Sequence, residues 1–185
     1  MTRQLVGPIL AIFSFALPAP AQTPRIDVSA GYSYLASSRT GSQGLHGGNT
    51  SLAVGVTDWF GIAADFSGHG GSLPTFGLVP TATTRLFMFA AGPRFTYRGN
   101  ARFRPYGQAL FGVVHQSADV TFPPLGTISV STNHFATLLG GGLDIEVSER
   151  VAVRLPDVNF LIYSPGRATS RLRIGAGIVF RFGKK

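Results

Sequence analysis

Eight segments of this sequence alternate apolar residues with polar or small ones, and this pattern constrains the fold more than any other feature. In Ser170–Phe182, apolar residues at even positions from Leu172 to Phe182 alternate mostly with arginines and glycines. Such alternation is typical of β-strands with one apolar face, whereas an amphipathic helix repeats about every 3.6 residues. The eight segments are Arg25–Ala36, Asn49–Val56, Phe60–His69, Leu86–Arg98, Arg104–Gln116, Asn133–Val147, Val151–Tyr163 and Ser170–Phe182.

One segment breaks its own alternation. In Val151–Tyr163, Arg154 and Asn159 fall on opposite faces of a regular strand. Because proline cannot donate a hydrogen bond to a neighbouring strand, Leu155-Pro156 is the natural place for an irregularity. We therefore predict a β-bulge there.

Strand lengths and connections favour a membrane barrel. The segments have about the 9–11 residues, or slightly more, of a tilted transmembrane strand. The connections 57–59, 99–103 and 148–150 are short, whereas Ser37–Gly48, Gly70–Ala82, Ser117–Thr132 and Ser164–Thr169 are mostly longer. Short periplasmic turns and longer extracellular loops are typical of bacterial outer-membrane barrels. Aromatic residues near the short turns predict an interfacial girdle: Trp59, Tyr97, Phe103, Tyr106, Phe180 and Phe182.

We therefore predict an all-β fold, an eight-stranded antiparallel up-and-down transmembrane β-barrel. A soluble β-sandwich or lipocalin-like barrel is the alternative, because its strands also alternate. In this chain, however, one face of each strand carries a stripe of large apolar residues, while the opposite face is rich in glycine. That distribution favours lipid outside and a narrow lumen inside.

The N-terminus predicts export. Arg3 is followed by an apolar stretch, Leu5–Leu17, of about 13 residues, a signal-peptide length that is too short to span a bilayer. Ala19-Pro20-Ala21 supplies small residues where a signal peptidase cleaves. We expect residues 1–21 to be a signal peptide, residues 22–185 to form the barrel domain, and the mature chain to lie in the cell outer membrane.

Composition excludes several kinds of chemistry. The chain has no cysteine, which removes disulfides, thiolate catalysis and cysteine-bound metals. Its formal net charge is +8, but the basic residues are spread singly instead of forming the stripe that follows a nucleic-acid backbone. We expect no cofactor, no metal and no nucleic-acid partner.

The sequence resembles the small eight-stranded outer-membrane barrels of the OmpA and OmpX kind. The resemblance rests on 91-AGPRF-95, 104-RPYGQALFG-112, 140-GGGLD-144 and 176-AGIVFRFG-183. It implies a structural, adhesive or surface-interaction role, assembly by the outer-membrane machinery and contact with lipid and lipopolysaccharide. It also implies a chain that is not an enzyme; we further expect a monomer.

Charges on the predicted inner face are expected to pair, because an unpaired charge in a narrow lumen is costly. We predict Asp65 with Arg94, Asp144 and Glu146 with Arg154, and Asp27 with Arg181. Met88, Gln108, Leu110 and Arg173 are also expected inside, so side chains plug the lumen and exclude conduction. A small porin is the alternative.

Two further sets of residues lie near the predicted loops. Arginine forks suit the phosphates of lipopolysaccharide, so we predict contacts from Arg39, Arg85, Arg167 and Arg171. The histidines His46, His69, His115 and His134 are expected to be solvated. His115 and Ser117 are similar to the His-x-Ser pair of eight-stranded lipid A deacylases, which is the enzymatic alternative. Asp119 is the nearest acid, but it lies on the wrong side of the serine for a catalytic relay.

Overall fold

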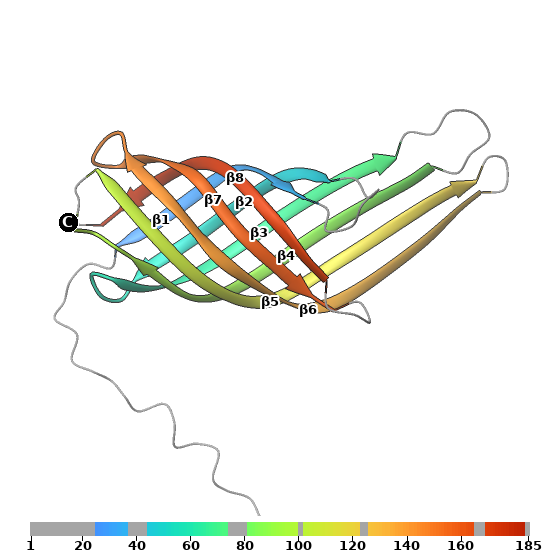
Figure 1. Cartoon of the computed structure of the whole chain (residues 1–185), viewed down its shortest axis with the longest axis horizontal. Coiled ribbons are helices and arrows are strands. Elements are labelled where there is room, and N and C mark those ends of the chain that lie inside the picture. The colour runs from blue at the N-terminus through green and yellow to red at the C-terminus, as the bar shows by residue number, and fades with distance from the viewer. Residues whose placement is uncertain are drawn as a thin grey trace, which may run out of the picture.

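The computed structural model describes residues 25–36, 44–73, 81–99, 102–122, 126–164 and 169–183. The predicted signal segment lies outside these residues. The strands are β1 (Ile26–Leu35), β2 (Leu45–Gly55), β3 (Phe60–Leu73), β4 (Thr81–Thr96), β5 (Phe103–Phe122), β6 (Gly126–Glu146), β7 (Val151–Tyr163) and β8 (Thr169–Phe182). Each strand pairs antiparallel with the next, and β8 pairs with β1 to close a barrel (Figure 1). The predicted fold class is confirmed.

The predicted faces explain why these segments form a barrel wall. In β8, Ile178, Phe180 and Phe182 are exposed on the outside, while Val179 and Arg181 between them are buried. An exposed apolar outer face is stable only where lipid covers it. No helix within the described residues is long and apolar enough to cross a membrane.

The predicted irregularity in β7 is present. The pairing of β7 with β8 shifts between Arg154 and Asp157, on either side of Pro156. The pairing of β7 with β6 shifts at the same level, between Gly142 and Asp144. Because of the extra residue, Asp157 and Asn159 both point inward and are buried.

Strands β5 and β6 are much longer than predicted, at 20 and 21 residues. The segment Ser117–Thr132, predicted as a loop, is instead mostly a continuation of this hairpin, with Phe122 paired to Gly126. Pairing of β3 with β4 and of β4 with β5 also continues toward the same end. Pairing of β6 with β7 stops earlier, at Ala136 and Tyr163. Four strands therefore extend beyond the other four (Figure 1).

We call this extension the protruding sheet; it comprises residues 71–73, 81–85, 117–122 and 126–135. Its alternation has the opposite sense to that of the barrel. In β5 and β6 the inward-facing residues of the barrel have even numbers. The apolar residues Val120, Ile128 and Val130 have even numbers, whereas Ser129 and Ser131 have the odd numbers of outward-facing residues. The change of phase, together with the many Ser and Thr residues, gives the segment the composition of a loop.

The lumen contains an apolar cluster, of which only Met88 and Leu110 were predicted to point inward. It lies at the end of the barrel from which the sheet protrudes, with Leu35 and Tyr163 at the strand ends. Its larger members are Leu35, Leu45, Leu86, Met88, Leu110, Val114, Leu138, Leu161 and Tyr163. Charged side chains occupy the remaining part, toward the short turns.

Glycine at position 112 allows β4 and β5 to approach closely. A Cβ atom on Gly112 would lie 1.9 Å from the carbonyl oxygen of Phe89 and 2.6 Å from the Cα of Ala90. Both atoms belong to the backbone and can move only with the strand. On Gly107, in the same strand, a Cβ would meet only the carbonyl oxygen of Gly140, at 3.9 Å.

Gly112→Ala is therefore expected to lower the free energy of unfolding by about 3 kcal/mol, the upper part of the range for overpacked sites. Urea unfolding in lipid vesicles measures the change. Gly107→Ala is the matched control and should stay within about 0.5 kcal/mol of the wild type. Equal effects of the two substitutions would contradict the close approach.

Candidate functional site

Asp144 is the centre of the charges in the lumen. It lies on β6, is 1% exposed, and pairs with Arg154 of β7 through distances of 2.7 and 3.1 Å. Arg94 of β4 donates to the same carboxylate at 3.4 Å, and Arg181 of β8 lies 3.6 Å from it. Arg154 also donates to Ser29 of β1, at 3.1 Å. One acid thus links side chains from opposite walls.

Tyr106 belongs to this set and not to the aromatic girdle, which corrects the prediction. Two guanidinium groups lie over its ring, with the Cζ atoms of Arg94 and Arg154 at 3.7 and 4.6 Å from the ring centroid. Its hydroxyl donates to Asp157 at 2.8 Å. The physical reason is that Tyr106 lies two residues before buried Gln108, so both side chains point to the inner face of β5. Cations over an aromatic face are attracted by the ring quadrupole.

Asp65 is paired with Arg173, so the expected pair with Arg94 is wrong. The guanidinium of Arg173 donates two hydrogen bonds to the Asp65 carboxylate, at 2.7 and 3.0 Å. In the register of β3 with β4, Asp65 lies opposite Ala90 and Arg94 lies opposite Gly61. The stagger of the strands therefore separates Asp65 from Arg94, and Arg173 reaches Asp65 across the lumen from β8.

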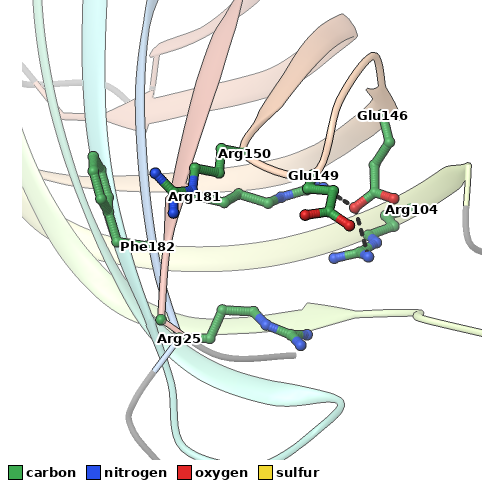
Figure 2. A pocket seen from close by; sticks show the side chains of 8 residues that line it. Arg25, Arg104, Glu146, Glu149, Arg150, Arg181 and Phe182 are labelled. Carbon is green, nitrogen blue, oxygen red and sulfur yellow. Dashed lines mark hydrogen bonds and ion pairs between the residues drawn. The ribbon is translucent and has the colours of Figure 1, made fainter.

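At the short turns, Glu146 is the acid that two arginines share. Arg104 lies 2.5 Å from Glu146, and Arg181 pairs with the same carboxylate oxygen (Figure 2). The expected pair of Glu146 with Arg154 is therefore wrong, because the register places Glu146 opposite Ala152. Asp27 does lie beside Arg181, but at a longer distance of 3.7 Å.

The same side chains line a cavity at the short-turn end. Its volume is about 490 Å³, and it lies between the barrel mouth and the β6–β7 turn (Figure 2). Its lining residues are Arg25, Arg104, Glu146, Glu149, Arg150, Arg181, Phe182 and Gly183. Four arginines against two glutamates leave this end with an excess of positive charge.

Of the four loop-side arginines, the structure describes two, Arg85 and Arg171, and these two do not lie side by side. Arg85 is exposed on β4, and Arg171 is half-buried on β8, a strand that does not neighbour β4. Arg39 and Arg167 lie outside the described residues. The structure therefore gives the positions of only two of the four arginines that were predicted to contact lipopolysaccharide.

His69 corrects the expectation of solvated histidines. It is buried in the lumen, and its Nε2 forms a hydrogen bond with Ser33 Oγ at 2.8 Å. His46 bonds to Tyr32 at 2.5 Å, and His115 bonds to Asn133 at 2.7 Å. Among the described residues, no three His, Asp or Glu side chains gather as a metal site.

Several members of the network were not predicted as partners, among them Arg104, Tyr106, Asp157 and Asn159. Arg104 and Tyr106 could have been found from the alternation of β5, because they lie four and two residues before the inward-facing Gln108. For Asp157 and Asn159, the extra residue of the bulge at Pro156 shifts the alternation by one. The faces of these two residues can therefore be assigned only once the bulge has been located.

Solved structures share this architecture at low sequence identity. Ail, the attachment invasion locus protein of Yersinia pestis, matches with a TM-score of 0.62 and 16% identity, over 87% of this chain and 99% of that chain. Neisserial surface protein A matches with a TM-score of 0.58 and 14% identity, over 86% and 97%. The N-terminal barrel of Pseudomonas aeruginosa OprF gives 0.52 and 17%, over 87% and 98%. No curated protein of similar sequence was found.

The sequence itself matches a family model, that of the outer membrane protein beta-barrel domain, over residues 8–182. The match covers nearly the whole chain and agrees with the closed barrel of eight antiparallel strands. The short turns are accordingly periplasmic and the protruding sheet is extracellular. The chain belongs to the outer membrane protein beta-barrel domain family, and it is a protein of the cell outer membrane.

Proposed function

We propose that this barrel serves as a structural and surface-interaction element whose extracellular end contacts lipopolysaccharide and whose lumen does not conduct. The protruding sheet is the observation that carries the surface role. It extends β3, β4, β5 and β6 beyond the strands on the opposite side of the barrel. A strand that only spans the membrane needs about 9–11 residues, whereas β5 and β6 have 20 and 21.

The chemistry of the protruding sheet supports this role. Its outer face carries polar groups, among them Arg85, Asp119 and Ser129, where the barrel below carries Phe and Ile. A polar outer face suits water and the sugars and phosphates of lipopolysaccharide, and it would be unstable against acyl chains. The change of face therefore marks the level at which the hydrocarbon layer ends.

A polyanion is the ligand that the extracellular arginines favour. Guanidinium groups bind phosphate and sulfate through paired hydrogen bonds. Arg85 is exposed, and the Nε of half-buried Arg171 has no hydrogen-bond partner among the residues that the structure describes. Ail, a barrel of the same fold, has been solved in complex with the heparin analogue sucrose octasulfate. That complex supports a polyanion site on a barrel of this kind.

The double variant Arg85→Gln/Arg171→Gln is expected to bind lipopolysaccharide about 5- to 10-fold more weakly, because each partly exposed charge contributes up to about 1 kcal/mol. Titration of the folded protein with lipopolysaccharide at low and at physiological salt measures the loss. Arg150→Gln, at the periplasmic end, is the matched control and should not change the affinity. An unchanged affinity of the double variant would contradict the proposed contact.

The ion pairs support a lumen that does not conduct. Arg173 joins β8 to β3, and Arg94 joins β4 to β6, so both side chains extend into the lumen and contact strands that are not their neighbours. The apolar cluster around Leu86 and Leu138 fills the part of the lumen between these ion pairs and the extracellular end. Eight strands enclose an interior that side chains can fill, whereas aqueous pores appear at about 16–18 strands.

Pure folded protein in a planar bilayer is therefore expected to give no steady, large single-channel current. A trimeric porin measured in the same membrane provides the positive control. Reproducible nanosiemens-scale openings from this protein would contradict the proposal and favour the small-porin alternative.

We also propose that the chain is not an enzyme. The deacylase alternative needs a carboxylate that orients the histidine toward the serine. His115 and Ser117 lie on the outer face of β5, but His115 forms its hydrogen bond with the amide of Asn133. A neutral amide does not stabilise the imidazolium that forms during acyl transfer as a carboxylate does.

A further inference from the structure

A groove on the outside of the barrel lies at the periplasmic end of β4 and β5. Its volume is about 370 Å³, and its lining residues are Trp59, Phe95, Thr96, Tyr97, Pro105, Tyr106 and Gly107. Trp59 and Phe95 stack with a centroid distance of 5.8 Å and an interplanar angle of 15°. Trp59 and Tyr97 are 62% and 65% exposed, as expected for side chains at a membrane–water interface.

The groove is open because residue 107 is a glycine. Gly107 lies directly opposite Phe95 in the register of β4 with β5. A Cβ at this position would have only the carbonyl oxygen of Gly140 nearby, at 3.9 Å. The missing side chain therefore leaves open space on the lipid-facing wall, and it is not needed for strand contact.

A second cavity continues from this groove toward the periplasm. It has a volume of about 510 Å³ and shares Trp59, Thr96 and Tyr97 with the groove. Its other lining residues are Arg25, Asp58, Arg98, Gly99 and Arg104. Arg104 already pairs with Glu146, so Arg25 and Arg98 against Asp58 leave this cavity with an excess of one positive charge.

The arginines of the second cavity lack enough acid to balance them. Arg98 is held by the backbone, donating to the carbonyl oxygens of Asp58 at 2.6 Å and Thr57 at 3.3 Å. Neither Arg98 nor Arg25 forms an ion pair within the described part of the chain. Burial lowers the pKa of Arg98 from its ordinary value, and the neighbouring Arg25 cation lowers it further. An anion bound there would reverse this effect.

We propose that groove and cavity together bind one glycerophospholipid of the periplasmic leaflet, with an acyl chain against Trp59 and the headgroup phosphate at Arg98 and Arg25. The aromatic level of a barrel is where headgroups meet acyl chains, so both parts of a lipid reach the site together. The excess positive charge favours an anionic headgroup such as phosphatidylglycerol. It disfavours phosphatidylcholine, whose choline cation would meet the same arginines.

Trp59 is the only tryptophan of the chain, so its fluorescence reports on this groove alone. The folded protein is reconstituted in phosphatidylcholine vesicles that contain increasing fractions of brominated phosphatidylglycerol or brominated phosphatidylcholine. Bromine quenches tryptophan at contact. We expect phosphatidylglycerol to bind about fivefold more tightly, the effect of one basic residue near a lipid surface. Equal quenching curves for the two lipids would overturn the proposal.

Two variants separate the headgroup from the acyl chain. Arg98→Gln should reduce the preference for phosphatidylglycerol to about one, whereas Arg150→Gln, in the β6–β7 turn at the same end but outside the groove and the second cavity, should leave it unchanged. Gly107→Leu fills the groove and should reduce the quenching of Trp59 by both lipids. Heat-modified migration on gels confirms that each variant is folded. A preference that survives Arg98→Gln, or quenching that survives Gly107→Leu, would overturn the corresponding part of the site.

Inorganic phosphate, at matched ionic strength, distinguishes a lipid site from a simple anion site. A lipid held by its chain and its phosphate should resist displacement, so excess phosphate is expected to change the quenching little. Complete loss of the preference for phosphatidylglycerol in phosphate buffer would show a free-anion site instead and would overturn the lipid assignment.

Discussion

Asp144→Ala is expected to lower the free energy of unfolding by about 3–5 kcal/mol, the cost of breaking a buried ion pair by removing one partner. The carboxylate is almost fully buried and faces three guanidinium groups, those of Arg94, Arg154 and Arg181. Its removal leaves these cations with less compensation in a place of low water content. Urea unfolding in lipid vesicles, followed by Trp59 fluorescence and by migration on gels, measures the change.

Glu149→Ala provides the control, because Glu149 is exposed in the β6–β7 turn and should cost less than about 0.5 kcal/mol. Asp144→Asn should lie between the two, since the amide oxygen still accepts a hydrogen bond from Arg154 while the charge is lost. If Asp144→Ala and Glu149→Ala had equal effects, Asp144 would not be the centre of the charges in the lumen.

The barrel could be predicted from sequence because its two environments differ so strongly. Lipid outside and a narrow lumen inside require opposite side chains at successive positions, and a strand places successive side chains on opposite faces. Phe180 and Arg181 show the contrast within one pair of residues. Even the bulge at Pro156 could be located, because Arg154 and Asn159 can both point inward only if an extra residue intervenes.

The protruding sheet could not be found by the same criterion, although it has the same strand geometry. Above the hydrocarbon layer the outer face meets water, so Ser129 and Ser131 replace the large apolar residues on that face. The apolar residues Ile128 and Val130 move to the other face. Apolar and polar residues still alternate, but the apolar residues now lie on the inner face and the polar residues on the outer face. A prediction that requires one fixed phase ends the strand too early.

The ion pairs of the lumen were predicted only in part, for a geometric reason. Parity showed that Asp65, Arg94, Arg173 and Asp144 point inward. It gave no information on which side chains meet across the barrel, because that depends on the stagger of strands that are distant in sequence. Asp144 with Arg154 was found because β6 and β7 are neighbours in register. Asp65 with Arg173 was not, because it joins β3 to β8.

The pair of Asp65 and Arg173 gives the second large expected effect, and the size of this effect depends on whether one partner or both are replaced. Both side chains are at most 2% exposed and share two hydrogen bonds. Asp65→Leu or Arg173→Met alone leaves a buried charge without its main partner and should cost about 3–5 kcal/mol. The double variant removes both charges and leaves apolar side chains near the apolar cluster. We expect it to lie within about 1 kcal/mol of the wild type, because apolar replacement of a buried pair is often neutral.

Arg173→Met is tolerable in the double variant because the remaining acid nearby keeps other partners. Asp157 lies 3.9 Å from Arg173, but it also accepts hydrogen bonds from Tyr106 at 2.8 Å and from Asn159 at 2.7 Å. Urea unfolding of the wild type, the two single variants and the double variant completes a thermodynamic cycle. A coupling free energy of about 3 kcal/mol or more is expected. Additive losses would show that the two side chains stabilise the barrel independently, and that the bidentate contact between β3 and β8 contributes nothing of its own.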